Sequence, residues 1–290
     1  MNRPLVLDGG LATELEAMGH DLADALWSAR LLADAPEEIV AAHAAFYRAG
    51  ADIATTASYQ ASFAGFADRG ISRAEAERLL RRSVELARLA GEIEGGETRI
   101  VAASVGPYGA TLADGSEYRG DYGLSKQQLR DFHLPRMEVL AESRPDVLAL
   151  ETVPDVREAE VLVEAVAEIG IPAWLSYTVD GGKTRAGQSL VDAFALAESD
   201  AIGWVGVNCS APDEVLPALE IARRSTPKPL IAYPNSGESW DSDHRTWIGA
   251  THLSADQARE WRTAGAKIIG GCCRVPPEEI TALAHALTTT

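Results

Sequence analysis

The chain is poor in cysteine and in basic residues, and it has no long apolar run. Its 290 residues include three cysteines, and 26 Lys and Arg stand against 43 Asp and Glu, a formal net charge of −17. Three cysteines are too few, and odd in number, for a disulfide framework. A charge this negative repels phosphate backbones and anionic headgroups, which argues against nucleic-acid and membrane partners. No apolar run approaches the roughly 18 residues that span a bilayer.

The sequence also lacks the marks of export, of linkers and of repeats. The opening residues MNRPLVLDGG contain no basic segment followed by an apolar core, so we expect no signal peptide and a cytoplasmic location. In that reducing compartment the thiols are expected to stay free or to bind metal. Apolar residues at 46% and charged residues at 24% are typical of a globular chain. We expect residues 1–290 to form one domain.

Eight short apolar runs alternate with longer stretches of helical period. The runs are Leu5–Leu7, Ile53–Thr56, Ile100–Ser104, Val147–Leu150, Ala173–Tyr177, Trp204–Val207, Leu230–Ala232 and Lys267–Ile269. Prolines and capping residues mark the helix starts between them, and Ser72 three residues before Glu75 predicts a capping box. The alternation predicts a parallel sheet, and eight units favour a closed (β/α)8 TIM-type barrel over an open doubly wound sheet.

Polar residues gather where these runs end, which is where parallel α/β folds carry their chemistry. Cys209 follows the sixth run, and Cys272 and Cys273 follow the eighth. Three thiolates on one zinc ion leave a fourth tetrahedral position open, as catalytic zinc sites do. The sequence therefore predicts a zinc site of these three cysteines at the C-terminal face of the strands. The alternatives are buried apolar cysteines and a strained bridge between Cys272 and Cys273.

Two acids, Asp8 and Glu151, follow the first and fourth runs. Each alone fits a helix cap or a salt bridge, but together, opposite a thiolate site, they can hold a substrate ammonium group. The glycines beside them, beginning with Gly9, let the backbone approach a ligand closely. The six histidines lack metal-binding spacing and are interpreted as surface or packing residues. Trp240 and Trp247 flank a polar stretch, where they either pack over the barrel or line a pocket.

Taken together, these motifs give the chain a family resemblance. It resembles the homocysteine S-methyltransferase family from Leu5 to about Leu287, through Asp8-Gly-Gly, Glu151-Thr, Gly206-Val-Asn-Cys209 and Gly270-Gly-Cys272-Cys273-Arg274. The resemblance implies a (β/α)8 barrel with one Zn²⁺ held by Cys209, Cys272 and Cys273. It also implies homocysteine binding by Asp8 and Glu151.

Further segments resemble the branch of this family that uses S-methylmethionine. They are Thr56–Ser62, Ser104–Ala110, Leu112–Tyr122 and Tyr233–Glu238. This likeness adds Ser58, Tyr59 and Asn235 to the expected substrate-binding residues, with Gly9 beside Asp8. Between Gly237 and Leu253, on the expected donor side of the pocket, the match to this branch is looser.

The resemblance implies an enzyme that transfers a methyl group from a sulfonium donor to L-homocysteine and forms methionine. The expected donor is S-methylmethionine, and S-adenosylmethionine is the second candidate. Zinc would deprotonate the homocysteine thiol, and the thiolate would attack the methyl group in line. The alternatives are a betaine-dependent transferase, a zinc hydrolase, and a non-catalytic thiolate barrel that binds metal or senses redox state. The expected partners are these small molecules, and no oligomeric state is predicted.

Overall fold

A computed structural model describes residues 3–22, 28–96, 99–241 and 246–288, with the side chains of 239–247 left outside the description. One parallel sheet of eight strands runs in the order β1-β12-β9-β8-β5-β4-β3-β2. These strands are β1 (Leu5–Val6), β2 (Ile53–Thr55), β3 (Ile100–Val105), β4 (Val147–Val153), β5 (Ala173–Tyr177), β8 (Ile202–Asn208), β9 (Leu230–Tyr233) and β12 (Ala266–Ile269). Every predicted strand is present, although β4 continues three residues beyond its predicted end.

The two ends of this strand order meet and close the sheet. Leu7 forms a parallel bridge with Ile53. On either side of the bridge, the Asp52 N–H donates to the Val6 carbonyl at 2.7 Å and the Asp8 N–H donates to the Ile53 carbonyl at 3.0 Å. The contacts between β1 and β2 confirm the predicted TIM-type barrel and exclude the open sheet.

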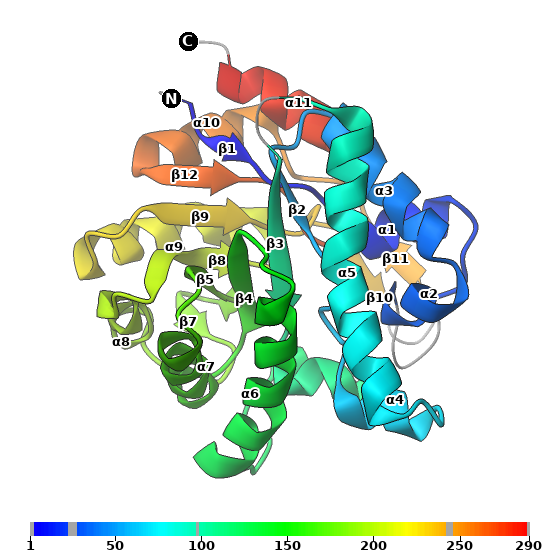
Figure 1. The fold of residues 1–290 in the computed structure, drawn as a ribbon. Coiled ribbons are helices and arrows are strands. Elements are labelled where there is room, and N and C mark those ends of the chain that lie inside the picture. The colour runs from blue at the N-terminus through cyan, green and yellow to red at the C-terminus, as the bar shows by residue number, and fades with distance from the viewer. Residues whose placement is uncertain (1–2, 23–27, 97–98, 242–245, 289–290) are drawn as a thin grey trace.

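Helices form an outer layer around the barrel (Figure 1). The α-helices are α1 (Leu11–Ala17), α2 (Ser28–Asp34), α3 (Pro36–Arg48), α4 (Phe63–Asp68), α5 (Arg73–Glu94), α6 (Lys126–Glu142), α7 (Val156–Ile169), α8 (Leu190–Ala195), α9 (Pro212–Ser225), α10 (Ala255–Ala264) and α11 (Pro277–Thr288). Short 3-10 turns are η1 (Tyr108–Leu112), η2 (Ser116–Tyr118) and η3 (Leu196–Glu198). Each barrel strand is thus followed by at least one helix, as the alternation predicted.

The helix starts follow local capping chemistry. Ser125 at α6 forms a complete capping box, and so does Ser254 at α10. At α5 only half of the predicted box forms. The Ser72 hydroxyl accepts from the Glu75 N–H at 3.3 Å, but the Glu75 carboxylate pairs with Arg78 instead of returning to the cap. An arginine one turn away therefore competes for the acid that the box requires.

Two apolar layers support the strand ends. One lies between the sheet and the helices, and the other fills the inside of the barrel. The inner layer takes side chains from successive strands, among them Leu7, Ile53, Trp174, Ile231 and Ile268. Because the interior is packed, the barrel is a solid base, and the chemistry is confined to its mouth.

Two small hairpins are additions that the strand pattern did not predict. They are β6 (Val179–Asp180) with β7 (Lys183–Thr184), and β10 (Ser239–Asp241) with β11 (Thr246–Ile248). Both pair antiparallel. In the part of the chain that the structure describes, no helix has the length and apolar character needed to cross a bilayer.

Candidate functional site

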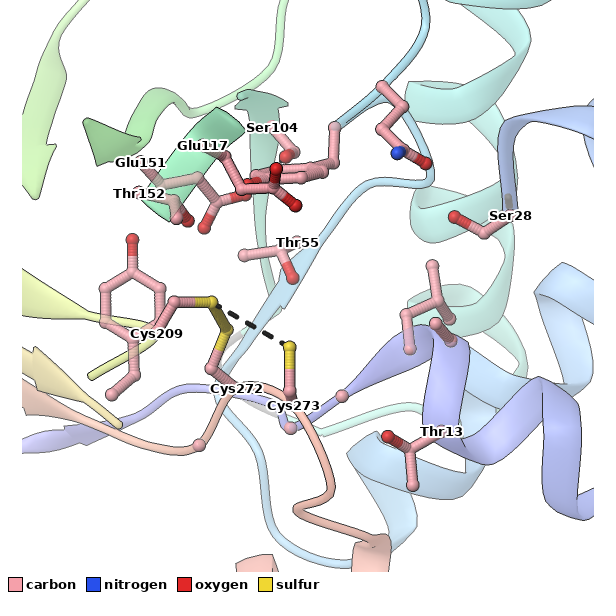
Figure 2. Close-up of a pocket in the computed structure, with 18 of the residues that line it drawn as sticks. Thr13, Ser28, Thr55, Ser104, Glu117, Glu151, Thr152, Cys209, Cys272 and Cys273 are labelled. Atoms are coloured by element: carbon pink, nitrogen blue, oxygen red, sulfur yellow. Dashed lines mark hydrogen bonds between the residues drawn. A yellow bond between two sulfur atoms is a disulfide. The ribbon is translucent and has the colours of Figure 1, made fainter. Parts of the chain in front are cut away.

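The carboxyl ends of β8 and β12 bring the three cysteines together (Figure 2). Cys209 directly follows β8, and Cys272 and Cys273 follow β12, with β9 between the two strands. All three Sγ atoms lie within 4.8 Å of one another, and those of Cys209 and Cys273 are 3.9 Å apart. Residues separated by 63 positions in the sequence thus share one point at the barrel mouth.

Two of these sulfurs are bonded to each other. Cys209 and Cys272 form a disulfide with Cα atoms 5.6 Å apart, and Cys273 is a free thiol (Figure 2). The expectation that all thiols are free or metal-bound is therefore wrong for this structure, and the alternative bridge between Cys272 and Cys273 is also absent. The physical reason is proximity, since 5.6 Å falls within the usual Cα range of a disulfide, whereas adjacent residues are only about 3.8 Å apart.

The backbone at two strand ends is left-handed, with φ of +46° at Cys209 and +57° at Thr152. The Asn208 side chain holds Thr152, because its Oδ1 accepts from the Thr152 N–H at 2.7 Å and its Nδ2 donates to the Thr152 hydroxyl at 2.8 Å. The Cys209 carbonyl accepts from the Thr178 hydroxyl at 3.1 Å. Unfavourable backbone of this kind persists only where the surroundings impose it. The position of Cys209 is therefore fixed by its neighbours.

The loop after β12 is anchored to the end of β9. The Cys272 N–H donates to the Pro234 carbonyl at 2.7 Å. The Cys273 N–H donates to the Asn235 Oδ1 at 3.2 Å. Asn235, predicted to bind substrate, lies outside the described lining of the adjacent cavity and holds a cysteine in place.

Gly9 lies where two backbone segments approach closely. A Cβ atom there would lie 2.2 Å from the carbonyl oxygen of Val275, so no larger residue fits. Beside it, the Gly271 N–H donates to the Asp8 carbonyl at 3.0 Å and ties β1 to the cysteine loop. The glycine predicted to approach a ligand therefore also meets a packing requirement within the protein.

A cavity of about 120 Å³ opens beside the cysteines. Its described lining comes from the ends of most barrel strands and from η2, with α1 and α2 on one side. The lining residues are Gly9, Gly10, Leu11, Ala12, Thr13, Ser28, Thr55, Thr56, Tyr59, Gln60, Ser104, Glu117, Tyr118, Glu151, Thr152, Cys209, Tyr233, Gly271, Cys272 and Cys273.

Glu151 is a buried acid that lines this cavity and faces the cysteines from its other side (Figure 2). Ser104 donates to its carboxylate, and Tyr233, which accepts from the Trp174 indole at 3.0 Å, is its second partner. Burial raises the pKa of Glu151 to about 7, against the lowering effect of these hydrogen bonds. The group therefore changes charge near neutral pH.

Asp8 is buried beside Thr55, outside the described cavity lining. Its carboxylate accepts from the Thr55 N–H at 2.7 Å and from the Thr55 hydroxyl at 3.0 Å. Burial holds the pKa of Asp8 well above its usual value, the Thr55 hydrogen bonds oppose this, and the charge of Glu151 adds to it. Asp8 thus positions a residue of the cavity wall and lies close enough to Glu151 for that carboxylate to raise the pKa of Asp8.

Of the two remaining predicted residues, one lines the cavity and one supports it. Tyr59 lines the cavity and hydrogen-bonds Thr152. Ser58 is buried and donates to the Ser104 carbonyl at 2.7 Å. Ser58 therefore holds the residue that hydrogen-bonds Glu151.

Glu117 and Tyr118 are among the cavity residues that were not predicted from the sequence. Both belong to η2, within the segment Leu112–Tyr122 that carries part of the resemblance. Tyr118 hydrogen-bonds the Cys273 thiol, whose pKa burial raises to about 11 against that hydrogen bond. A signal was present, because Gly115 and Gly120 mark tight turns around an acid and a tyrosine in the long segment between β3 and α6.

The other aromatic and histidine predictions have mixed outcomes. Trp240 pairs with Trp247 through the backbone of the β10–β11 hairpin, but both side chains lie outside the described residues, as does most of the expected donor-side segment. His43 and His133 are buried packing residues, and His133 hydrogen-bonds Glu158 at 2.8 Å. Neither lies in the described cavity lining.

Known proteins resemble this chain over nearly its full length. The chain is 47% identical to a homocysteine S-methyltransferase of Escherichia coli, covering 96% of this chain and 94% of the relative. It is 46% identical to homocysteine S-methyltransferase 4 of Zea mays, covering 97% and 89%. The solved E. coli homocysteine methyltransferase MmuM superposes with a TM-score of 0.88 in both its metallated and its oxidized form, at 44% identity over 98% of this chain and 96% of that one.

A family model also matches nearly the whole chain. Residues 5–287 match the model described as homocysteine S-methyltransferase, which is nearly the whole chain. The barrel, the converging cysteines and the buried acids at its mouth lie inside that match. The chain therefore belongs to the homocysteine S-methyltransferase family.

Proposed function

We propose that this chain, as one homocysteine-binding domain over residues 1–290, transfers a methyl group from a sulfonium donor to L-homocysteine and forms methionine. The donor is S-methylmethionine, on the strength of the segments Thr56–Ser62 and Leu112–Tyr122. One observation carries the proposal most strongly. Three cysteine sulfurs and the buried Glu151 face a single cavity in a member of this methyltransferase family.

Zinc is the metal that this donor set fits. Two sulfurs bound tetrahedrally at about 2.3 Å from zinc lie about 3.8 Å apart, and the sulfurs of Cys209 and Cys273 are separated by 3.9 Å. Cys209, Cys272 and Cys273 would hold the ion once the disulfide is reduced to two thiols. When bound, zinc would act as a Lewis acid that lowers the pKa of the substrate thiol. A reducing cytoplasm would keep the site in that form.

The acids at the mouth suit the ammonium group of homocysteine. Glu151 faces the cavity and offers a carboxylate in a buried place, where a charge-assisted hydrogen bond is strong. Asp8 fixes Thr55 in the cavity wall through two hydrogen bonds. Thr56 and Ser58 hold Ser104, which in turn holds Glu151. The substrate would therefore meet a pre-formed acidic pocket beside the cysteines.

The reaction balances without a protein acid or base. The homocysteine thiol loses its proton to solvent, its sulfur forms a bond to the donor methyl carbon, and the bond from that carbon to the sulfonium sulfur breaks. The departing donor takes both bonding electrons and leaves as a neutral thioether. Holding the two sulfurs in line within the cavity would supply much of the rate.

A four-donor assay tests this function. Purified, reduced, zinc-loaded protein is given homocysteine with S-methylmethionine, S-adenosylmethionine, betaine or methylfolate, and methionine is measured. We expect the highest kcat/KM with S-methylmethionine and the second highest with S-adenosylmethionine. A preference for betaine would identify the other branch, and no turnover with any donor would favour the non-catalytic alternative.

Metal removal gives the second test. We expect one zinc per chain in the reduced protein, none in the protein with the Cys209–Cys272 disulfide, and recovery after reduction. Cys272→Ala should lose both zinc and methyl transfer, because two thiolates are left where three are needed. A metal-free Cys272→Ala protein with full activity would contradict the role of the cysteines.

A further inference from the structure

Glu117 is a buried acid that the proposed chemistry has not used. It lies in η2, is 4% exposed and lines the cavity. Its Oε2 atom is buried and has no hydrogen-bond partner among the described residues. An unpartnered carboxylate oxygen inside a protein costs free energy, so it calls for a ligand or another explanation.

The positive charge that acts on Glu117, that of Arg119, comes from outside the described cavity lining. Of the described residues that line the cavity, none is Lys, Arg or His. The acid shares the cavity with Glu151 and the three cysteines, which add negative charge when ionised. Tyr59, Tyr118 and Tyr233 add aromatic rings, whose faces attract cations. The acidic and aromatic side chains of this lining favour a positively charged occupant.

The loop that carries Glu117 is held in place by its own hydrogen bonds. Gly115 has a left-handed backbone with φ of +77° and begins the turn. The Asp114 carboxylate accepts from the Ser116 N–H at 3.0 Å, and the Ser116 hydroxyl accepts from Arg119 at 2.8 Å. Arg119 thus pairs with the outer side of the loop and with Asp114, which leaves Glu117 on the cavity side.

The cysteines and Glu117 lie on facing sides of the cavity. Figure 2 shows Glu117 on the same side as Glu151 and Ser104, across from Cys209, Cys272 and Cys273. The charge of Glu117 contributes to raising the pKa values of Cys273, Tyr59 and Tyr118, so it acts across the whole cavity. A cation bound beside Glu117 would therefore lie between this carboxylate and the cysteine cluster.

We propose that Glu117 binds the sulfonium centre of the methyl donor, an assignment that rests on the proposed function. The free carboxylate oxygen lies on the side of the cavity from which a sulfonium would present a methyl group to the cysteine cluster. Glu151, already bonded to Ser104 and Tyr233, is left for the homocysteine ammonium. The donor loses its positive charge on transfer, so the attraction to Glu117 disappears in the product and favours its release.

Variants at this position test the proposal by steady-state kinetics. Glu117→Gln keeps the shape and removes the charge, so the KM for S-methylmethionine should rise at least about tenfold. The KM for homocysteine and the zinc content should change by less than about twofold. Glu117→Asp should recover part of the donor affinity. Asp121→Asn is the matched control, because it removes one acid from the same loop at an exposed site. This variant should leave kcat and both KM values unchanged.

A second donor separates the two cationic groups of S-methylmethionine. Dimethylsulfonioacetate carries a sulfonium but no ammonium group, and Glu117→Gln should raise its KM by a similar factor. An effect confined to S-methylmethionine would assign Glu117 to the donor ammonium and overturn the sulfonium assignment. An unchanged donor KM, or a rise in the homocysteine KM instead, would also overturn it.

A binding measurement keeps this inference distinct from the proposed function. Titration of reduced wild-type protein with trimethylsulfonium chloride, followed by calorimetry, should give at least about tenfold tighter binding than to Glu117→Gln. Equal affinities overturn the Glu117 site even if the enzyme is an active methyltransferase. Tight, Glu117-dependent binding without methionine formation from any donor supports the cation site while the proposed function fails.

Discussion

At the residue scale, the environment of Glu151 determines how the proposed binding of homocysteine should depend on pH. Its carboxyl is buried, it accepts from Ser104, and its pKa is raised to about 7. Below that pH the group is a neutral acid, and above it a carboxylate that can pair with an ammonium group. Homocysteine binding should therefore strengthen as pH rises through about 7.

Glu151→Gln tests that role. The amide keeps the hydrogen bond to Ser104 but cannot become anionic, so the KM for homocysteine should rise about 10- to 100-fold at pH 8. The fall in the wild-type KM between pH 6 and pH 8 should also be lost in the variant. Steady-state kinetics across this pH range measures both effects. Zinc content should stay the same, and loss of zinc would show that Glu151 is structural.

Residue types at strand ends were predictable from the sequence, but their partners were not. Cys209, Cys272 and Cys273 share a rare chemistry and a common edge, so their convergence followed from the barrel alone. Glu117 lies in a short loop whose path depends on turns and on packing against η1. The hydrophobic periodicity of the sequence does not predict the path of such a loop. The disulfide was missed because an expected compartment says nothing about which pairs of sulfurs are close enough to bond.

At the scale of the element, β8 carries the first cysteine and depends on a close strand contact. Gly206 pairs with Ile231 of β9, and a Cβ at Gly206 would lie 1.8 Å from the Ile231 carbonyl oxygen. No side chain can be accommodated there unless the two strands separate. The glycine in the motif Gly206-Val-Asn-Cys209 thus fixes the distance between β8 and β9, and with it the position of Cys209.

Gly206→Ala should displace the end of β8. We expect a loss of roughly 1–3 kcal/mol or more in the free energy of unfolding, as overpacking typically costs, together with weaker zinc binding. Gly203→Ala in the same strand is the control, because its nearest contact is the Ala173 carbonyl at an ordinary 3.7 Å. Denaturant unfolding and zinc titration measure the two effects. Equal stability of the two variants would refute the close-contact argument.

Strand order and helix starts were largely predictable, because apolar period and capping chemistry are local properties. The half-formed capping box at Ser72 shows the limit, since Arg78 one turn later takes the acid. The hairpin of β10 and β11 escaped prediction for a different reason. Its strands are three residues each in a polar stretch, too short for an alternating pattern to stand out.

At the scale of the whole molecule, a buried histidine links stability to pH. His43 in α3 is fully buried, and neither ring nitrogen has a hydrogen-bond partner within the described structure. Burial lowers the pKa of His43 to about 4. The unfolded chain takes up a proton near pH 6.5 and the folded chain does not, so stability falls as pH drops from about 6.5 to about 4.

His43→Leu should flatten that dependence. Between pH 7 and pH 4, the buried histidine accounts for a fall of up to about 3 kcal/mol in the free energy of unfolding, and the variant should not show that fall. At pH 7 the free energy of unfolding of the variant should be about 1 kcal/mol higher than that of the wild type, because leucine leaves no unpartnered polar atom buried at position 43. His133, with its pKa also lowered to about 4, leaves part of the slope in place. Denaturant unfolding at several pH values measures the change, and an unaltered slope would contradict the account.

The central claim is that a methyl group passes from a sulfonium directly to homocysteine in this barrel. The most direct measurement uses S-methylmethionine with deuterated S-methyl groups and homocysteine labelled with nitrogen-15, with the products read by mass spectrometry. We predict that nitrogen-15 methionine carries the deuterated methyl and forms in equal amount to unlabelled-nitrogen methionine left from the donor. Donor consumption without any deuterated methyl on nitrogen-15 methionine would contradict the account.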